Sequence, residues 1–185
     1  MSNIILKNNT SVSALIYMFQ GTTLSGRIPV GANGGSVMVP TTNSYSVTGT
    51  ITMDDGNTYV TAPASFSSPS QNVLAQVFQN EGTYTFQLLT TSGTTPSAIT
   101  VSNSCKYPVQ FSIKRDGSPL SSVIVVDSYN DDSISTMQTY TFAGVVDGIT
   151  TEPITSSNPS IVVAVVADNN AVSDFQGYSL AFQRP

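Results

Sequence analysis

Apolar and polar residues alternate along many short segments of this chain, and turn residues separate the segments. Single residues separate Ala14, Ile16 and Met18, and the same spacing recurs from Val109 to Ile113. A period of two indicates strands with one buried face, and no window keeps the spacing of an amphipathic helix. The pattern therefore predicts an all-β protein.

The order of these segments occurs twice. The pattern of residues 4–8 returns at residues 99–103, and that of residues 45–49 returns at residues 140–144. Each copy shows short strands with turns between them, which is typical of a sandwich or a Greek-key barrel. We expect a tandem duplication of a small antiparallel β-sandwich or Greek-key unit, with repeats at residues 1–89 and 99–185 and a linker at residues 90–98.

Two Asp-Gly pairs and one apolar run sharpen this expectation. Asp55-Gly56 and Asp147-Gly148 lie between strand-like segments, where an Asp-Gly pair favours a type I′ hairpin. The apolar run Ile161–Ala167 is far shorter than the roughly 20 residues of a membrane-spanning helix. It predicts a buried strand, and we expect no transmembrane segment.

The surface must be polar with little charge. Charged residues make up 9% of the chain, with 6 Lys and Arg against 11 Asp and Glu, whereas there are 27 Ser and 23 Thr residues. So few cations make nucleic acid and anionic lipid surfaces poor partners. A weakly charged surface favours self-association, so we expect a homo-oligomer.

The residue types that most enzymes use are scarce. The chain has no histidine and one cysteine, Cys105, so neither a Ser-His-Asp or Cys-His arrangement nor a histidine zinc site is available. Cys105 has no second cysteine for an internal disulfide and is expected to be a buried or turn thiol. We expect a protein that is not an enzyme and has no cofactor.

One acidic cluster is a candidate metal site. Asp131, Asp132 and Ser135 resemble the calcium motif of βγ-crystallins, a duplicated Greek-key family, although Thr136 departs from its last position. The alternative is a solvated turn without metal. The pair Asp54-Asp55 is better explained as part of a hairpin, because Gly56 follows it.

Tyrosines are the candidate ligand-binding residues. The alternation of the strands places Tyr17, Tyr59, Tyr107 and Tyr129 where their rings could face outward. A planar ring and neighbouring amides suit a neutral glycan or a lipid interface. Packing in a core or an interface is the alternative for each of them.

The openings of the repeats carry a family resemblance, seen best in Ile99–Ser104 followed by Pro108–Ile113. They resemble the start of small bacterial all-β insecticidal and aegerolysin-like cytolytic proteins. The resemblance implies cytoplasmic accumulation and later action at the surface of a target cell. No secretion signal is expected, since Lys7 is followed at once by polar residues.

Two functions remain open at this stage. The first is a toxin-like or lectin-like binding protein that recognises a cell-surface glycan or lipid headgroup through two similar repeats. The second is a self-assembling structural or inclusion-forming protein that builds a filament, a coat or an intracellular crystal. Duplication serves both functions, because it supplies either two binding sites or two contact surfaces.

Overall fold

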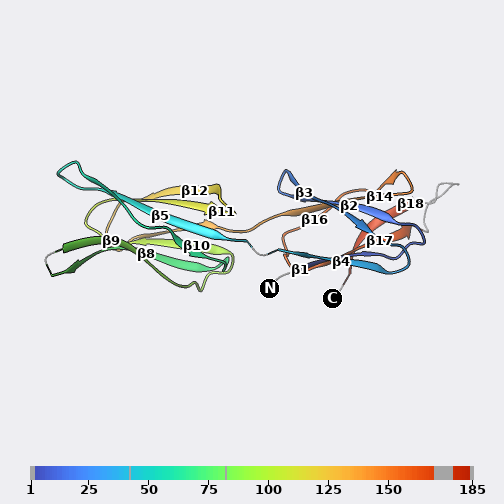
Figure 1. The fold of residues 1–185 in the computed structure, drawn as a ribbon, viewed down its shortest axis with the longest axis horizontal. Helices are drawn as coiled ribbons and strands as arrows, with labels where there is room; N and C mark the ends of the chain where they lie inside the picture. The colour runs from blue at the N-terminus through green and yellow to red at the C-terminus, as the bar shows by residue number, and fades with distance from the viewer. Residues whose placement is uncertain (1–2, 42, 82, 169–176, 184–185) are drawn as a thin grey trace. The chain divides into compact units, whose positions relative to one another are not determined.

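The computed structural model describes residues 3–41, 43–81, 83–168 and 177–183, and every regular element in these ranges is a β-strand (Figure 1). The all-β prediction is therefore confirmed. In this part of the chain no helix is present that is long and apolar enough to span a membrane.

The chain folds into two compact units that do not follow the expected repeat boundaries. Unit 2 is continuous, from Asn43 to Met137, whereas unit 1 combines Met1–Thr42 with Gln138–Pro185. We call these two parts of unit 1 the N-terminal segment and the C-terminal segment. Each unit thus joins half of one predicted repeat to half of the other.

Unit 2 is a sandwich of two sheets, which lie as two layers in Figure 1. One sheet has the order β13-β10-β8-β9, and the other has the order β12-β11-β5-β6 with β7 also paired to β5. Its strands are β5 (Tyr45–Thr52), β6 (Thr58–Val60), β7 (Ala64–Phe66), β8 (Gln71–Asn80), β9 (Thr83–Ser92), β10 (Ala98–Asn103), β11 (Val109–Arg115), β12 (Ser118–Val125) and β13 (Asp131–Ser135).

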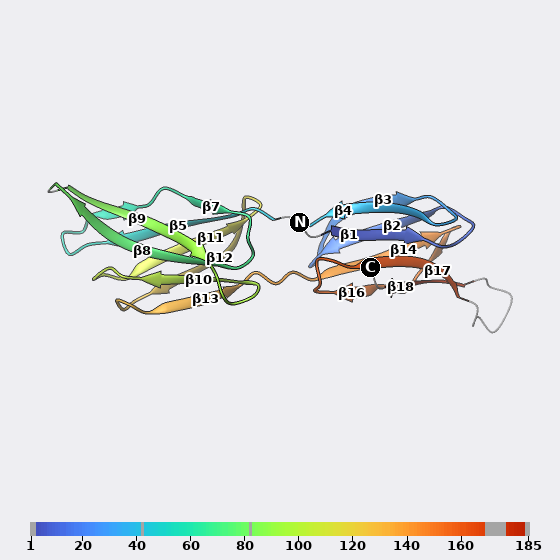
Figure 2. The same cartoon turned by 90° about the horizontal axis from the view of Figure 1, so that it is seen from below.

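Unit 1 has the same pairing scheme, strand for strand. Its sheets have the orders β18-β17-β1-β4 and β15-β14-β2-β3, with β16 also paired to β14, and Figure 2 shows β1 between β4 and β17. Its strands are β1 (Asn3–Asn8), β2 (Ala14–Gln20), β3 (Thr23–Val30), β4 (Gly35–Pro40), β14 (Tyr140–Val146), β15 (Ile149–Thr150), β16 (Ile154–Ser156), β17 (Val162–Asp168) and β18 (Gly177–Gln183).

The parallel strand pairs explain why the units cross the repeat boundary. β10 pairs in parallel with β8 in unit 2, and β1 pairs in parallel with β17 in unit 1. In each pair one strand comes from each predicted repeat. The expected linker, residues 90–98, is part of unit 2, because Thr90–Ser92 belong to β9, Ala98 begins β10 and the Gly93 amide donates to the Ser70 carbonyl at 3.2 Å.

Each unit has its own hydrophobic core between its two sheets. In unit 1, β14 alternates fully buried with half-buried residues, and Val162–Val165 of β17 are all buried. The apolar run at residues 161–167 therefore lies almost wholly on a buried strand, as predicted. In unit 2 the core includes Val101, Phe111 and Ile51.

The two Asp-Gly pairs form different turns. Asp147 and Gly148 both have positive φ, +49° and +77°, as the type I′ turn requires. At Asp55-Gly56 only Gly56 has a positive φ, +79°, and its amide donates to the Met53 carbonyl at 2.9 Å. The type I′ prediction is therefore wrong there, and the longer hairpin forms an ordinary turn that ends on a left-handed glycine.

A buried asparagine fixes the loop that follows β10. Asn103 has no exposed surface, and its Nδ2 donates to the carbonyls of Tyr107 at 2.9 Å and Val125 at 3.1 Å, while its Oδ1 accepts from the Cys105 amide at 2.7 Å. Asn8 makes the equivalent three bonds in unit 1. Since buried backbone groups need partners, this side chain determines the path of the loop.

We predict that Asn103→Ala lowers the free energy of unfolding by about 2–3 kcal/mol, because buried backbone groups of Tyr107, Val125 and Cys105 lose their partner. Urea denaturation measures this change. Asn130→Ala is the control, since that exposed side chain bonds only to exposed Asp127, and its effect is expected to stay within about 0.5 kcal/mol. Equal effects of the two substitutions would contradict this assignment.

Candidate functional site

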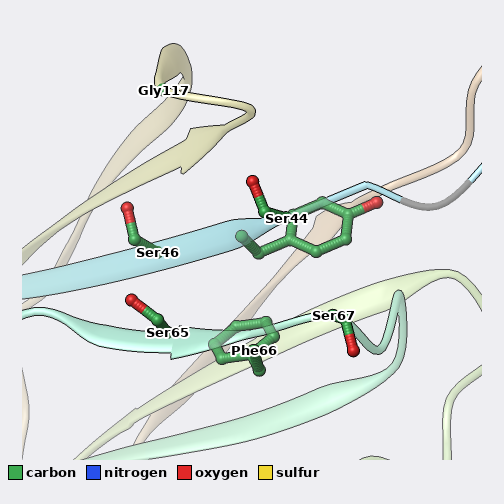
Figure 3. A pocket seen from close by; sticks show the side chains of 7 residues that line it. Ser44, Ser46, Ser65, Phe66, Ser67 and Gly117 are labelled. Carbon is green, nitrogen blue, oxygen red and sulfur yellow. The ribbon is translucent and has the colours of Figure 1, made fainter.

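One concave surface of unit 2 is rich in serine, and we call it the serine pocket. It has a volume of about 430 Å³, and Figure 3 shows Ser44 and Ser46 of the β5 region beside Ser65 of β7 and the hairpin turn at Gly117. The Phe66 ring stacks on Tyr45, with 5.9 Å between ring centroids. Ser67 also lines the serine pocket.

The serine pocket contains a pair of hydroxyl side chains on neighbouring strands, and unit 1 has an equivalent pair. The β5–β7 pair Ser46 and Ser65 corresponds to Thr141 and Thr155 of β14 and β16, whose hydroxyls lie 3.1 Å apart. Hydroxyl pairs across neighbouring strands stabilise the sheet itself. We therefore assign these hydroxyls to the fold and not to a specific ligand.

A second cavity in unit 2, which we call the tyrosine pocket, has a volume of about 410 Å³. It lies at the side of the sandwich where β6 and β9 end their respective sheets. Both sheets and the β10–β11 loop contribute side chains to it. The lining residues are Ile51, Met53, Tyr59, Val77, Tyr84, Phe86, Ser104, Cys105, Lys106 and Tyr107.

The tyrosine pocket has a buried apolar floor and aromatic walls. Ile51 and Cys105 are 1% and 3% exposed, whereas Tyr59 and Tyr84 at the rim are 43% and 66% exposed. Phe86 is half-buried between them and the core. A concave, mostly apolar surface with polar groups at its rim is the usual form of a small-ligand site.

The polar groups at the rim hold Tyr107 in place. Its hydroxyl donates to Asp54 Oδ2 at 2.7 Å, and Lys106 Nζ lies 3.7 Å from the same oxygen and 5.1 Å from the centre of the Tyr107 ring. The hydrogen bond to the Tyr107 hydroxyl and the charge interaction with the same group, and after these the negative charge of Asp54, raise the pKa of Lys106. The ammonium and carboxylate charges offset each other, so the rim carries no net charge.

Unit 1 does not reproduce this lining. Val12 stands where Tyr107 stands, because each carbonyl accepts from the buried asparagine of its unit. Ser11 stands where Lys106 stands. Ile149 pairs with the last core residue of β14, just as Tyr59 pairs with the last core residue of β5. At these three positions unit 1 has neither the tyrosines nor the lysine of unit 2, although Tyr178 of β18 stands where Phe86 stands.

The structure separates the four tyrosines that the sequence singled out. Tyr59 and Tyr107 meet in the tyrosine pocket. Tyr17 lies on β2 in unit 1, where its ring centre is 5.7 Å from the Arg27 guanidinium carbon. Tyr129 lies between β12 and β13, is 88% exposed and lines neither of the two pockets described above.

Tyr84 is the lining tyrosine that the sequence analysis did not select. It alternates with Phe86 and Leu88, which looks like a core-facing strand, but β9 pairs with β8 along its full length to Asn80 and Thr83. Tyr84 therefore lies on the outer part of a long hairpin, where its ring is mostly exposed. The length of the two neighbouring strands, ten residues each, is the feature that distinguishes this extended hairpin from the shorter ones.

The acidic cluster does not form a converging set of ligands. Asp131 and Asp132 are successive residues of the edge strand β13, so their side chains point to opposite faces of the sheet. Asp132 Oδ1 accepts from the Ser133 amide at 2.8 Å, and Ser135 Oγ accepts from the Met137 amide. Within the described residues, no group of three or more His, Cys, Asp or Glu side chains is placed to hold a metal ion.

Asp55 has a turn-forming role, in keeping with the hairpin explanation. Its carboxylate accepts from the Asn57 amide at 2.9 Å and from the Asn57 side chain at 2.7 Å. These bonds to the charged form lower the pKa of Asp55. It remains ionised in the hairpin that carries Asp54 to the pocket rim.

The chain matches no protein-family model, no curated protein and no solved structure. Assignment of a function therefore depends on the residues of the tyrosine pocket and on their chemistry.

We predict that Cys105 reacts slowly with iodoacetamide in the folded protein at pH 8 and rapidly in denaturant. Burial raises the pKa of the Cys105 thiol, and only the thiolate reacts. Mass spectrometry of time points measures the two rates. Similar rates in both conditions would show that the floor of the tyrosine pocket is open to solvent.

Proposed function

We propose that this chain is a non-catalytic binding protein that holds a neutral, hydroxylated ring, as in a glycan, in the tyrosine pocket. The observation that carries the proposal is the set of aromatic side chains that stand above an apolar floor. At the rim the positive and negative charges neutralise each other. A sugar ring has apolar C–H faces and polar edges. Tyrosine matches both, because its ring is apolar and its hydroxyl bonds to water or to a ligand.

The charge at the rim favours a glycan over an anionic lipid headgroup. Lys106 lies 3.7 Å from Asp54, so its ammonium already has a counter-ion. The chain as a whole has a net charge of −5, which repels an anionic membrane surface. A neutral ligand keeps the Lys106–Asp54–Tyr107 contacts intact when it binds.

The lining also favours binding over hydrolysis. Glycoside hydrolysis generally uses two carboxyl groups on either side of the bond that breaks. Among the residues that line the tyrosine pocket, none is Asp or Glu, and Asp54 at the rim is bonded to the Tyr107 hydroxyl. Binding at a target cell's surface, the role implied by the family resemblance, is compatible with such a site.

The proposal gives one site per chain instead of the two similar sites expected from duplication. Val12 and Ile149 occupy the positions in unit 1 where unit 2 has Tyr107 and Tyr59. Neither aliphatic side chain offers a ring face or a hydroxyl to a sugar. Avidity then requires association between copies of the chain.

We predict that Tyr59→Ala and Tyr84→Ala each weaken binding of a neutral oligosaccharide, chosen from a glycan array, by about tenfold or more. Loss of one aromatic contact removes on the order of 1–3 kcal/mol, and each 1.4 kcal/mol is tenfold in affinity. Isothermal titration calorimetry measures affinity and stoichiometry. One ligand per chain is the expected stoichiometry.

Tyr17→Ala and Tyr129→Ala are the matched controls, because both tyrosines lie outside the tyrosine pocket. Both variants are expected to bind like the parent chain. The proposal fails if no array glycan is retained, if two ligands bind per chain, or if the controls weaken binding as much as the pocket variants do.

A further inference from the structure

Unit 1 is assembled from the two ends of the chain. The N-terminal segment supplies β1–β4, and the C-terminal segment supplies β14–β18, while all of unit 2 lies between them in the sequence. The two segments are separate parts of the chain that become one sandwich by pairing with each other. Unit 2 needs neither segment for its own strand pairing.

The two segments are joined in both sheets of unit 1. β1 pairs in parallel with β17, and β2 pairs with β14 along seven residue pairs. The Gly21 amide donates to the Thr139 carbonyl at 2.8 Å, and Thr41 Oγ1 donates to the Pro159 carbonyl at 3.0 Å. Each of these bonds has its donor and acceptor in different segments.

The hydrophobic core of unit 1 is shared between the segments in the same way. The N-terminal segment contributes Leu6 and Ile16, and the C-terminal segment contributes Phe142 and Val163, each with no exposed surface. A segment without its partner exposes this apolar face and two unpaired strands, which is unfavourable in water. Each segment therefore requires a partner segment, and the contacts are the same whichever copy of the chain supplies it.

We propose that the N-terminal segment of one copy also pairs with the C-terminal segment of a second copy, linking chains head to tail through unit 1. Each copy then offers one segment of each kind, so the contact is between unlike surfaces and forms rings or open filaments. This exchange goes beyond glycan binding and does not involve the tyrosine pocket.

Concentration decides between closure within one chain and exchange between chains. The bonds are identical, so the difference is the entropy of bringing the segments together. Within one chain the two segments are tethered through unit 2, so their effective concentration is fixed and does not rise with the protein concentration. We therefore expect exchange to be rare in dilute solution and frequent at high protein concentration.

A pair of cysteines across the joint tests the exchange. Leu15 of β2 and Val145 of β14 are opposite each other and half-buried, so Leu15→Cys with Val145→Cys forms a disulfide across the two segments. The full-length chain also carries Cys105→Thr, since Thr10 occupies that position in unit 1. The protein is unfolded, refolded at micromolar or millimolar concentration, oxidised and run on a non-reducing gel.

The matched control is Thr50→Cys with Gln110→Cys, the corresponding opposite pair in unit 2. We expect monomers from both variants at micromolar concentration. At millimolar concentration we expect a ladder of disulfide-linked dimers and longer species from the unit 1 pair and monomers from the unit 2 pair. Urea melts of both reduced variants show whether each is folded before oxidation.

Two results overturn the exchange. The first is a folded unit 1 variant that gives only monomers at millimolar concentration. The second is an equal ladder from the unit 2 control, which means that strand exchange is not confined to the terminal segments. Glycan binding by the monomer is measured separately, so its failure and the failure of exchange are distinct outcomes.

Discussion

Both units depend on one parallel strand pair, β8 with β10 in unit 2 and β1 with β17 in unit 1. Sequence neighbours pair antiparallel through short turns, whereas parallel partners require a crossover from elsewhere in the chain. Here the partner comes from the other predicted repeat. Together with the antiparallel pairs β5–β11 and β2–β14, this pairing joins the two predicted repeats, makes unit 2 continuous and leaves unit 1 to be built from the two ends of the chain.

The buried asparagine at the end of the parallel pair connects the fold to the site. Asn103 bonds to the Tyr107 carbonyl and thereby fixes the loop that carries Lys106 and Tyr107 to the pocket. Asn8 fixes the same loop in unit 1, where Val12 replaces the tyrosine. One backbone scaffold thus presents a different surface in each unit, in keeping with the general rule that function resides in side chains placed on a shared fold.

Local features of this structure could be predicted from the sequence, and the pairing of distant strands could not. Alternation at Ala14–Met18 and the apolar run at Ile161–Ala167 indicated strands, because side-chain burial in a sheet follows a period of two. The two repeats have the same pattern, so the pattern does not say which copy of a strand pairs with which. The expected boundary at residues 90–98 failed for that reason.

The candidate site was predicted in part for a similar reason. Tyr59 and Tyr107 were selected from their expected outward position, but Tyr59 lies on the edge strand β6 and Tyr107 lies in the β10–β11 loop, and the fold alone brings both to one cavity. Tyr17 had the same local pattern and lies in the other unit. Whether an outward ring contributes to a cavity depends on strand order, which one-dimensional spacing does not contain.

The most direct test of the central claim is an NMR titration of the full-length chain, with ¹³C-labelled tyrosine rings, against a neutral oligosaccharide. The chain has 8 tyrosines and no tryptophan, so the aromatic spectrum is simple enough to assign by substitution. The account predicts that the ring signals of Tyr59, Tyr84 and Tyr107 shift together, and that those of Tyr17 and Tyr129 do not. Unchanged pocket signals, or equal shifts at Tyr17, would contradict it.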